Sequence, residues 1–136
     1  MKIDAYLSFE GRAEEAIQFY QKVLGAEVLM QMRFKEAPPE VTAQMGPGSG
    51  DKIMHAALRI GDSTVMASDG HCTGKGSFHG IALSLTLKDE AEVQRRYAAL
   101  AEGGQAQLAP HKTFFAHSFG MLADKFGVQW MVIAPL

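Results

Sequence analysis

One order of predicted elements occurs twice along the chain, and this repeat limits the fold more than any other feature. The first copy begins with an apolar strand over residues 3–9, then a helix over residues 13–24 and three strand-like segments. The second copy begins with a strand over residues 80–87 and a helix that runs to about residue 101. Because identity between the copies is weak, the repeat depends on the order and spacing of the elements. It predicts two βαβββ modules.

The two helices have clear boundary signals. Apolar residues from Ala13 to Leu24 recur at helical spacing and form one face, and Gly25 follows as a helix-terminating glycine. Asp89 is a good N-cap for the second helix, which Gly103-Gly104 ends. Each module therefore contains one amphipathic helix.

The remaining segments predict strands, one long loop and a linker. Residues 36–51 contain prolines and glycines without a sustained period, which favours a loop, and residues 70–78 are typical of a linker. Module one then covers about residues 1–69 and module two about residues 79–136, within a single domain. The further strands are expected at 26–35, 53–60, 63–69, 105–109, 113–122 and 126–134.

Composition excludes several classes of function. The formal net charge of −2 gives no broad basic surface for nucleic acid or for an anionic membrane. An acid falls too early in Met1–Ser8 for a secretory signal, and no apolar stretch has the length of a membrane span. Cys72 is the only cysteine, which excludes an internal disulfide and a cysteine-based zinc cluster. A cytoplasmic protein that binds neither nucleic acid nor membrane is expected.

Three segments carry a family resemblance that covers nearly the whole chain. Ala16–Gly25 contains a phrase close to FYxxVLG, His79–Leu85 precedes the second helix, and Asp124–Trp130 forms a late turn and strand. Together they resemble the vicinal-oxygen-chelate (VOC) superfamily, which includes glyoxalase I, bleomycin-resistance and extradiol-dioxygenase proteins. The resemblance implies an α+β fold in which two tandem βαβββ modules form a curved, barrel-like mixed sheet with the helices outside. It also implies a homodimer.

Within that superfamily the sequence is most similar to the PhnB-like group. Phe115 stands where the group usually has Trp, Ser118 where a basic residue is common, and Lys125 where Pro is usual. The segments that carry this similarity are His55–Asp62, Ser68-Asp69, Thr113–Phe115 and Phe119-Gly120.

Some members of the group carry a label that refers to a 3-demethylubiquinone methyltransferase. The sequence does not favour that activity, because no predicted strand ends in a glycine-rich turn that opens a helix, as a nucleotide-type cofactor requires. Gly46–Gly50 precedes a strand and is a weak candidate. No cofactor is expected.

The metal positions of metal-using relatives carry few ligands here. Those relatives supply His, Gln or Glu from the first, fourth, fifth and eighth strands. The corresponding positions are Gly80, Met131 and Ala67, or Met66 if the register of the fourth strand shifts by one. Asp4 alone could coordinate an ion, and one carboxylate is not a divalent-metal site. We expect no metal, with Ile81, Leu83 and Leu85 packed inward along the fifth strand.

The concave side should then bind a small organic ligand that has one anionic or hydrogen-bonding end. Strand alternation predicts which residues face it. The expected lining residues are Tyr6, Ser8, His55, Arg59, Ser84, Phe115 and Gln129.

Two enzymatic alternatives stay open, and no catalytic residue is assigned. One is a metal-dependent lyase or oxidoreductase of the glyoxalase or dioxygenase kind. The other is a metal-free enzyme that uses His55 and Asp4 as acid and base. The methionines could form a soft pocket for an apolar ligand, although their strand spacing favours ordinary core packing. They are Met30, Met32, Met45, Met54, Met66, Met121 and Met131.

Overall fold

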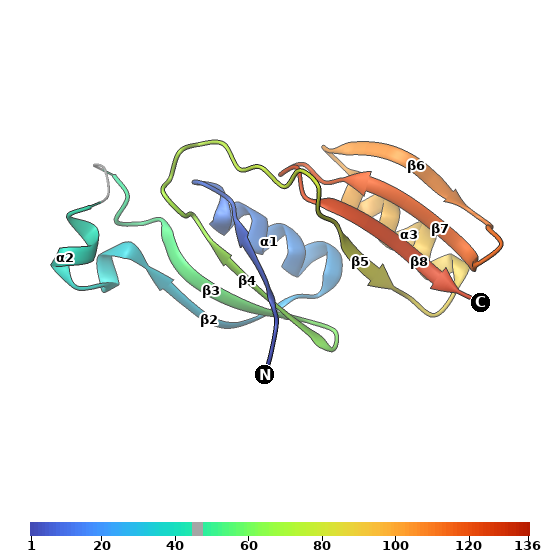
Figure 1. Ribbon diagram of the computed structural model, residues 1–136, viewed down its shortest axis with the longest axis horizontal. Coiled ribbons are helices and arrows are strands. Elements are labelled where there is room, and N and C mark those ends of the chain that lie inside the picture. Colours follow the sequence, from blue (N-terminus) through green and yellow to red (C-terminus); the bar gives the residue numbers. More distant parts are fainter. Residues whose placement is uncertain (45–47) are drawn as a thin grey trace. The chain divides into compact units, whose positions relative to one another are not determined.

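A computed structural model describes residues 1–44 and 48–136 of the chain and contains two compact units. The units are Met1–Gly76 and Ser77–Leu136, and each contains one βαβββ module (Figure 1). The predicted α+β class and the two modules are confirmed, with the eight strands arranged as two four-stranded sheets. Met45 and the first two residues of the weak cradle candidate, Gly46-Pro47, lie outside the described residues.

Module one is a mixed sheet with one helix against it (Figure 1). The strand order is β1-β4-β3-β2, in which β1 pairs with β4 in parallel and the other pairs are antiparallel. The predicted helix 13–24 is confirmed. The elements are β1 (Ala5–Ser8), α1 (Ala13–Leu24), β2 (Glu27–Arg33), β3 (Ile53–Ile60) and β4 (Ser63–Ser68).

A buried aspartate fixes the start of α1. Asp69 follows β4, and its Oδ1 accepts hydrogen bonds from the backbone N–H groups of Gly11 and Ala13, both at 2.8 Å. Its Oδ2 accepts from the N–H of Ile53 at 2.7 Å, at the start of β3. Because the first N–H groups of a helix have no partner within the helix, this carboxylate supplies the cap that the local sequence lacks. At the other end, Gly25 adopts the left-handed conformation, with φ of 66°.

Module two has the same layout, with strand order β5-β8-β7-β6. As predicted, Asp89 caps the helix, because its side chain accepts from the N–H of Glu92 at 2.9 Å. Tyr97 lies against Gly120, and its hydroxyl donates to the carbonyl of Met121 at 3.0 Å. The elements are β5 (Leu83–Thr86), α3 (Glu90–Ala101), β6 (Gln105–His111), β7 (Ala116–Ala123) and β8 (Gln129–Pro135).

Two predictions about local structure are wrong. The segment 36–51 is not a loop throughout, because a 3-10 turn η1 (Phe34–Glu36) and a short helix α2 (Pro39–Thr42) form there; a proline at the first helical position suits α2. The fifth strand begins at Leu83, and Ile81 is 62% exposed rather than packed inward. Gly80, with φ of 81°, belongs to a turn, so strand alternation does not yet apply at Ile81.

None of the helices within residues 1–44 and 48–136 has the length and apolar composition needed to cross a bilayer.

Candidate ligand-binding site

Each sheet has one face covered by its helix and one open face. In module two, Trp130 and Val132 of β8 are buried on the helix side, and the intervening Met131 lies on the open face. Met131 pairs with Ser84 of β5 and with Met121 of β7, so these three side chains share the open face.

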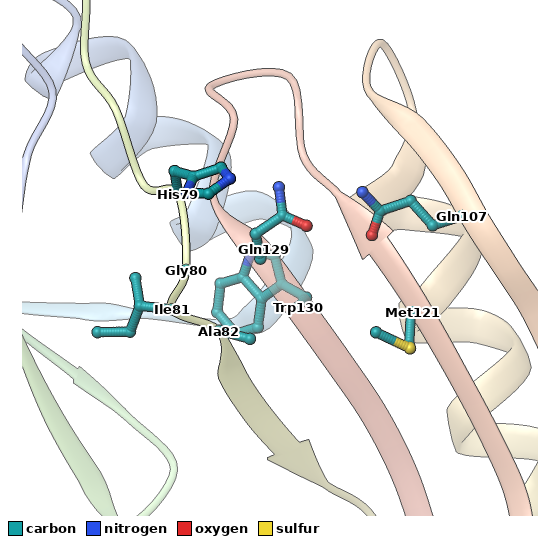
Figure 2. Close-up of a pocket in the computed structure, with 8 residues that line it drawn as sticks. All are labelled: His79, Gly80, Ile81, Ala82, Gln107, Met121, Gln129 and Trp130. Carbon is teal, nitrogen blue, oxygen red and sulfur yellow. The ribbon is translucent and has the colours of Figure 1, made fainter.

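A hollow of about 470 Å³ lies within module two. It begins at the segment that leads into β5 and extends across β8 and β7 to β6. Its volume is in the range of about 300–1,000 Å³ that small-molecule sites occupy. The hollow is lined by His79, Gly80, Ile81, Ala82, Gln107, Met121, Gln129 and Trp130 (Figure 2).

The lining combines apolar surface with three polar side chains, two amides and one imidazole. Figure 2 shows the amide groups of Gln107 and Gln129 extending toward each other, with the His79 ring on the other side of Gln129. Each amide carries both a donor and an acceptor, and the imidazole carries one more of each in its neutral form. No lining residue is Asp, Glu, Lys or Arg. The hollow can therefore orient a ligand by hydrogen bonds without an opposite charge.

A local network holds the β8 wall of the hollow. The Trp130 indole Nε1 donates to Asp124 Oδ2 at 2.9 Å. Asp124 Oδ1 accepts from the N–H groups of Phe126 and Val128 at 2.9 and 3.0 Å. Asp124 is buried, so one carboxylate ties the turn between β7 and β8 to the tryptophan. This is the D-x-F-G turn on which the family resemblance depends.

Three of the predicted ligand-binding residues belong to module two. Gln129 lines the hollow. Ser84 is exposed on the same open face, where it pairs with Met131. Phe115 is 41% exposed, and its ring packs edge-on against Phe119 with centroids 5.2 Å apart.

The other four predicted residues belong to module one, and two of them meet. The Tyr6 hydroxyl and His55 Nδ1 are 2.9 Å apart. Arg59 pairs with Glu27 at 2.5 Å on the exposed surface. The Ser8 hydroxyl donates to Glu10 instead of pointing to an open space.

Glu10 also accepts from the Thr73 hydroxyl at 2.9 Å, which ties β1 to the segment after β4. The hydrogen bond from Ser8, together with those from Thr73 and His71, lowers the pKa of Glu10 below its usual value of 4.5, against a smaller effect of burial. These contacts give Ser8 and Glu10 a role in holding the end of β1.

The structure shows which residue of the fourth strand faces the open side, and what Asp4 contacts. In the fourth strand the alternative register is correct, because Met66 pairs with Tyr6 on the open face and Ala67 is 1% exposed on the helix side. Asp4 and His55, the acid and base of the metal-free alternative, contact different residues. Asp4 forms an ion pair with Lys2 at 3.4 Å, and His55 contacts Tyr6. Within residues 1–44 and 48–136, no group of three or more His, Cys, Asp or Glu side chains could hold a metal ion.

The sequence analysis missed His79, Gln107 and Met121 as ligand-site residues. Met121 was assigned to strand packing, although alternation along the predicted strand 113–122 could have placed it beside Met131. Gln107 lies at an irregularity of the β6–β7 register, between the pairs Ala106–Leu122 and Leu108–Met121. No local signal marks that irregularity, so its side-chain direction was not predictable.

Comparisons with known proteins cover both modules. The family described as 3-demethylubiquinone-9 3-methyltransferase matches residues 1–133. Protein YjdN from Escherichia coli (strain K12) is 39% identical over 138 residues, which cover 97% of this chain and 94% of YjdN.

Solved structures agree with these matches. Protein PA1353 from Pseudomonas aeruginosa has a TM-score of 0.84 at 39% identity and covers 98% of this chain and 96% of its own. A putative 3-demethylubiquinone-9 3-methyltransferase, a PhnB protein from Bacillus cereus, has a TM-score of 0.80 at 28% identity over 98% of each chain. A glyoxylase/bleomycin resistance protein/dioxygenase domain from Frankia sp. EAN1pec shares the fold, with a TM-score of 0.64 at 13% identity over 98% of this chain and 94% of its own.

Proposed function

The chain belongs to the PhnB-like family described as 3-demethylubiquinone-9 3-methyltransferase, which has a VOC-like fold, and we propose that it binds a small, uncharged organic molecule in the hollow of module two. The observation that carries this proposal is the composition of the hollow. An apolar surface with a few convergent polar groups is typical of small-molecule sites. Here the polar groups are the two amides and the imidazole described above.

The charge of the lining selects the ligand class. An anionic ligand buried without a cation has to lose its hydration without compensation, which is costly. The lining includes no lysine or arginine, and Arg59 is engaged by Glu27 in module one. Of the two ligand ends expected from sequence, the hydrogen-bonding one is therefore favoured over the anionic one. Amide, carbonyl or hydroxyl groups on a mostly apolar body suit this site.

Binding is favoured over methyl transfer because of the connection between β1 and α1. A strand–turn–helix connection is where a nucleotide-type cofactor would be held, through the N–H groups at the helix start. In this chain those N–H groups, at Gly11 and Ala13, donate to Asp69. The position that a cofactor's acceptor groups would need is filled by the protein's own carboxylate.

The test uses a natural reporter in the site. Trp130 is the only tryptophan in the chain and lines the hollow, so its fluorescence should respond when a ligand binds. A panel of neutral and anionic metabolites is screened by thermal shift, because a ligand that binds the folded state alone stabilises it. Each hit is then titrated against Trp130 emission.

Two variants and one control test whether a ligand found in the screen binds in the hollow. Gln107→Ala and Gln129→Ala should each weaken binding by about tenfold, which corresponds to one lost hydrogen bond of about 1.4 kcal/mol. Gln105→Ala, on the same strand as Gln107 but outside the lining, should bind normally. Hits confined to anionic compounds, or equal affinities for all three variants, would contradict the proposal.

A further inference from the structure

The open face of module one carries a group of sulfur-containing side chains around the Tyr6–His55 pair. Strand pairing places Tyr6 of β1 beside Met66 of β4, Met66 beside Ala57 of β3, and Ala57 beside Met30 of β2. One row of four residues thus crosses the whole sheet. In the adjacent row, Met32 of β2 pairs directly with His55 of β3.

All of these side chains are on one face of the sheet, because paired residues share a face and residues two apart along a strand return to it. Ala57 is the smallest of them and lies between Met30 and Met66, so their longer side chains can approach each other above it. Directly opposed residues have Cβ atoms about 5 Å apart, and diagonal neighbours are within reach of long side chains. His55, Met32 and Met66 can therefore direct one nitrogen and two sulfur atoms to a common point.

The Tyr6 hydroxyl prepares the histidine for this role in the ring tautomer that carries its proton on Nδ1. It lies 2.9 Å from His55 Nδ1, and the bond passes over β4, the strand that separates β1 from β3. When Nδ1–H donates to the phenol oxygen, the proton is on Nδ1 and the lone pair is on Nε2. A histidine that binds a metal usually has its other ring nitrogen held in this way. Among the described contacts of His55, the hydrogen bond engages Nδ1 and leaves Nε2 available.

We propose that His55, Met32 and Met66, with Met30 beside them, form a binding site for a soft monovalent metal ion, Cu(I). Thioether sulfur and imidazole nitrogen prefer this ion, whereas Mg²⁺, Ca²⁺ and Mn²⁺ prefer oxygen ligands. The ligand set uses β2, β3 and β4 of one module and contains no carboxylate, and it shares only Met66 with the divalent site that sequence reasoning considered. All of its residues belong to module one, whereas the hollow is lined by residues of module two alone, so a variant in one set leaves the other set intact.

Exposure of the group is consistent with entry of an ion. Tyr6 is 51% exposed and Met30 is 40% exposed, while His55, Met32 and Met66 are half-buried. Arg59 and Glu27 on this face are paired with each other, and Asp4, two residues before Tyr6, is paired with Lys2, so the site is close to neutral. A neutral site of polarisable ligands favours a monovalent ion over a more highly charged one.

The test measures binding of Ag(I), a redox-stable substitute for Cu(I), and then of Cu(I) without oxygen. All proteins carry Cys72→Ser, because a thiol would itself bind both ions. Calorimetric titration should show one saturable site per chain. Methyl NMR of the methionines should show the largest shifts at Met32 and Met66.

Substitutions then assign the ligands. His55→Ala, Met32→Leu and Met66→Leu should weaken binding more than Tyr6→Phe, which removes only the partner of the histidine and should cost roughly tenfold. Met→Leu nearly conserves volume, so these variants should fold. Met54→Leu is the matched control, because Met54 neighbours His55 on β3 with its side chain on the other face. It should bind as tightly as the parent protein.

Tyr6 acts as a positioning residue, and its variant needs its own readout. In Tyr6→Phe, nitrogen NMR of His55 should show a mixture of ring tautomers where the parent protein shows one, with an unchanged melting temperature. The proposal is overturned by the absence of saturable Ag(I) and Cu(I) binding in the Cys72→Ser protein. It is also overturned if Met54→Leu weakens binding as much as Met32→Leu and Met66→Leu.

Discussion

Both modules contain a buried aspartate after a strand of the sheet, and the two residues hold different kinds of structure. Asp69 in module one accepts from Gly11, Ala13 and Ile53, which are distant from it in the sequence. Asp124 in module two accepts from Phe126, Val128 and Trp130, all within six residues. The first joins separate elements of the module, and the second shapes one turn and one wall of the hollow. The same element order is thus stabilised by long-range contacts in one module and by local ones in the other.

The largest expected loss of folding stability is for Asp69→Ala, which removes the long-range contacts of module one. Two buried backbone N–H groups and one part-buried one would lose their acceptor, and the loss of a buried one costs about 1–3 kcal/mol. We expect the free energy of unfolding to fall by about 3–5 kcal/mol in urea titrations, with faster amide exchange at Ala13 and Ile53. Asp69→Asn keeps one carbonyl oxygen and should lose less. An unchanged unfolding midpoint for Asp69→Ala would remove Asp69 from this role.

Asp124→Ala should have a smaller and more local effect. The loss of its contacts to Phe126, Val128 and Trp130 should cost about 3 kcal/mol, because the three donors belong to one short segment that can rearrange without separating distant elements. Trp130 emission should change in the native protein, while amide exchange in module one stays as in the parent. If exchange in module one rose equally, the contrast between local and long-range support would be wrong.

Two glycines near these aspartates, Gly104 and Gly70, allow the packing of the two modules to be compared by substitution with alanine. A Cβ at Gly104 would meet the backbone of Ala123 and Asp124, whereas a Cβ at Gly70 would meet the side chains of Glu10 and Ser8. Side chains can rotate away and backbone cannot, so Gly104→Ala should cost about 2 kcal/mol. Gly70→Ala should cost about 1 kcal/mol, mainly because φ there is +56°. Urea titration of both variants measures the two losses of folding stability. A larger loss for Gly70→Ala than for Gly104→Ala would contradict this prediction.

The smallest expected effect is a pH dependence specific to module one. The Ser8 hydroxyl, with further hydrogen bonds, holds the pKa of Glu10 below 4.5, so the carboxylate stabilises the folded state above that pH. This contribution is lost as the pH falls through the lower, folded-state pKa. Urea titrations from about pH 7 to about pH 3 should show a shallower decline for Glu10→Gln than for the parent protein. Equal slopes would show that Glu10 contributes nothing to the acid sensitivity.

The sequence predicted most of the fold because the signals for its elements are local. The helix over Ala13–Leu24 was predicted with its observed boundaries, and so was the strand 53–60, since amphipathic spacing and terminating glycines act over a few residues. The errors occurred where a turn replaced an extended backbone, as at Gly80, or where proline permitted a short helix, as at Pro39.

The candidate sites were predicted less completely. Face assignments by alternation placed Tyr6 and His55 on one side of module one, and the structure shows that they touch. The hollow of module two is lined by Gln129, which the sequence analysis named as a ligand-binding residue, and by Gln107, whose direction depends on a register irregularity in β6.

The sequence by itself determined the modules, the two long helices α1 and α3, and the family, because periodicity, caps and the FYxxVLG and D-x-F-G phrases are written in neighbouring residues. Only the tertiary structure decided that Asp69 caps α1 across the module, that Met66 rather than Ala67 lies on the open face, and that two glutamines converge over one hollow. The physical reason is that these outcomes depend on strand pairing. A shift of one residue in register turns a side chain to the opposite face, and local sequence contains little information about register.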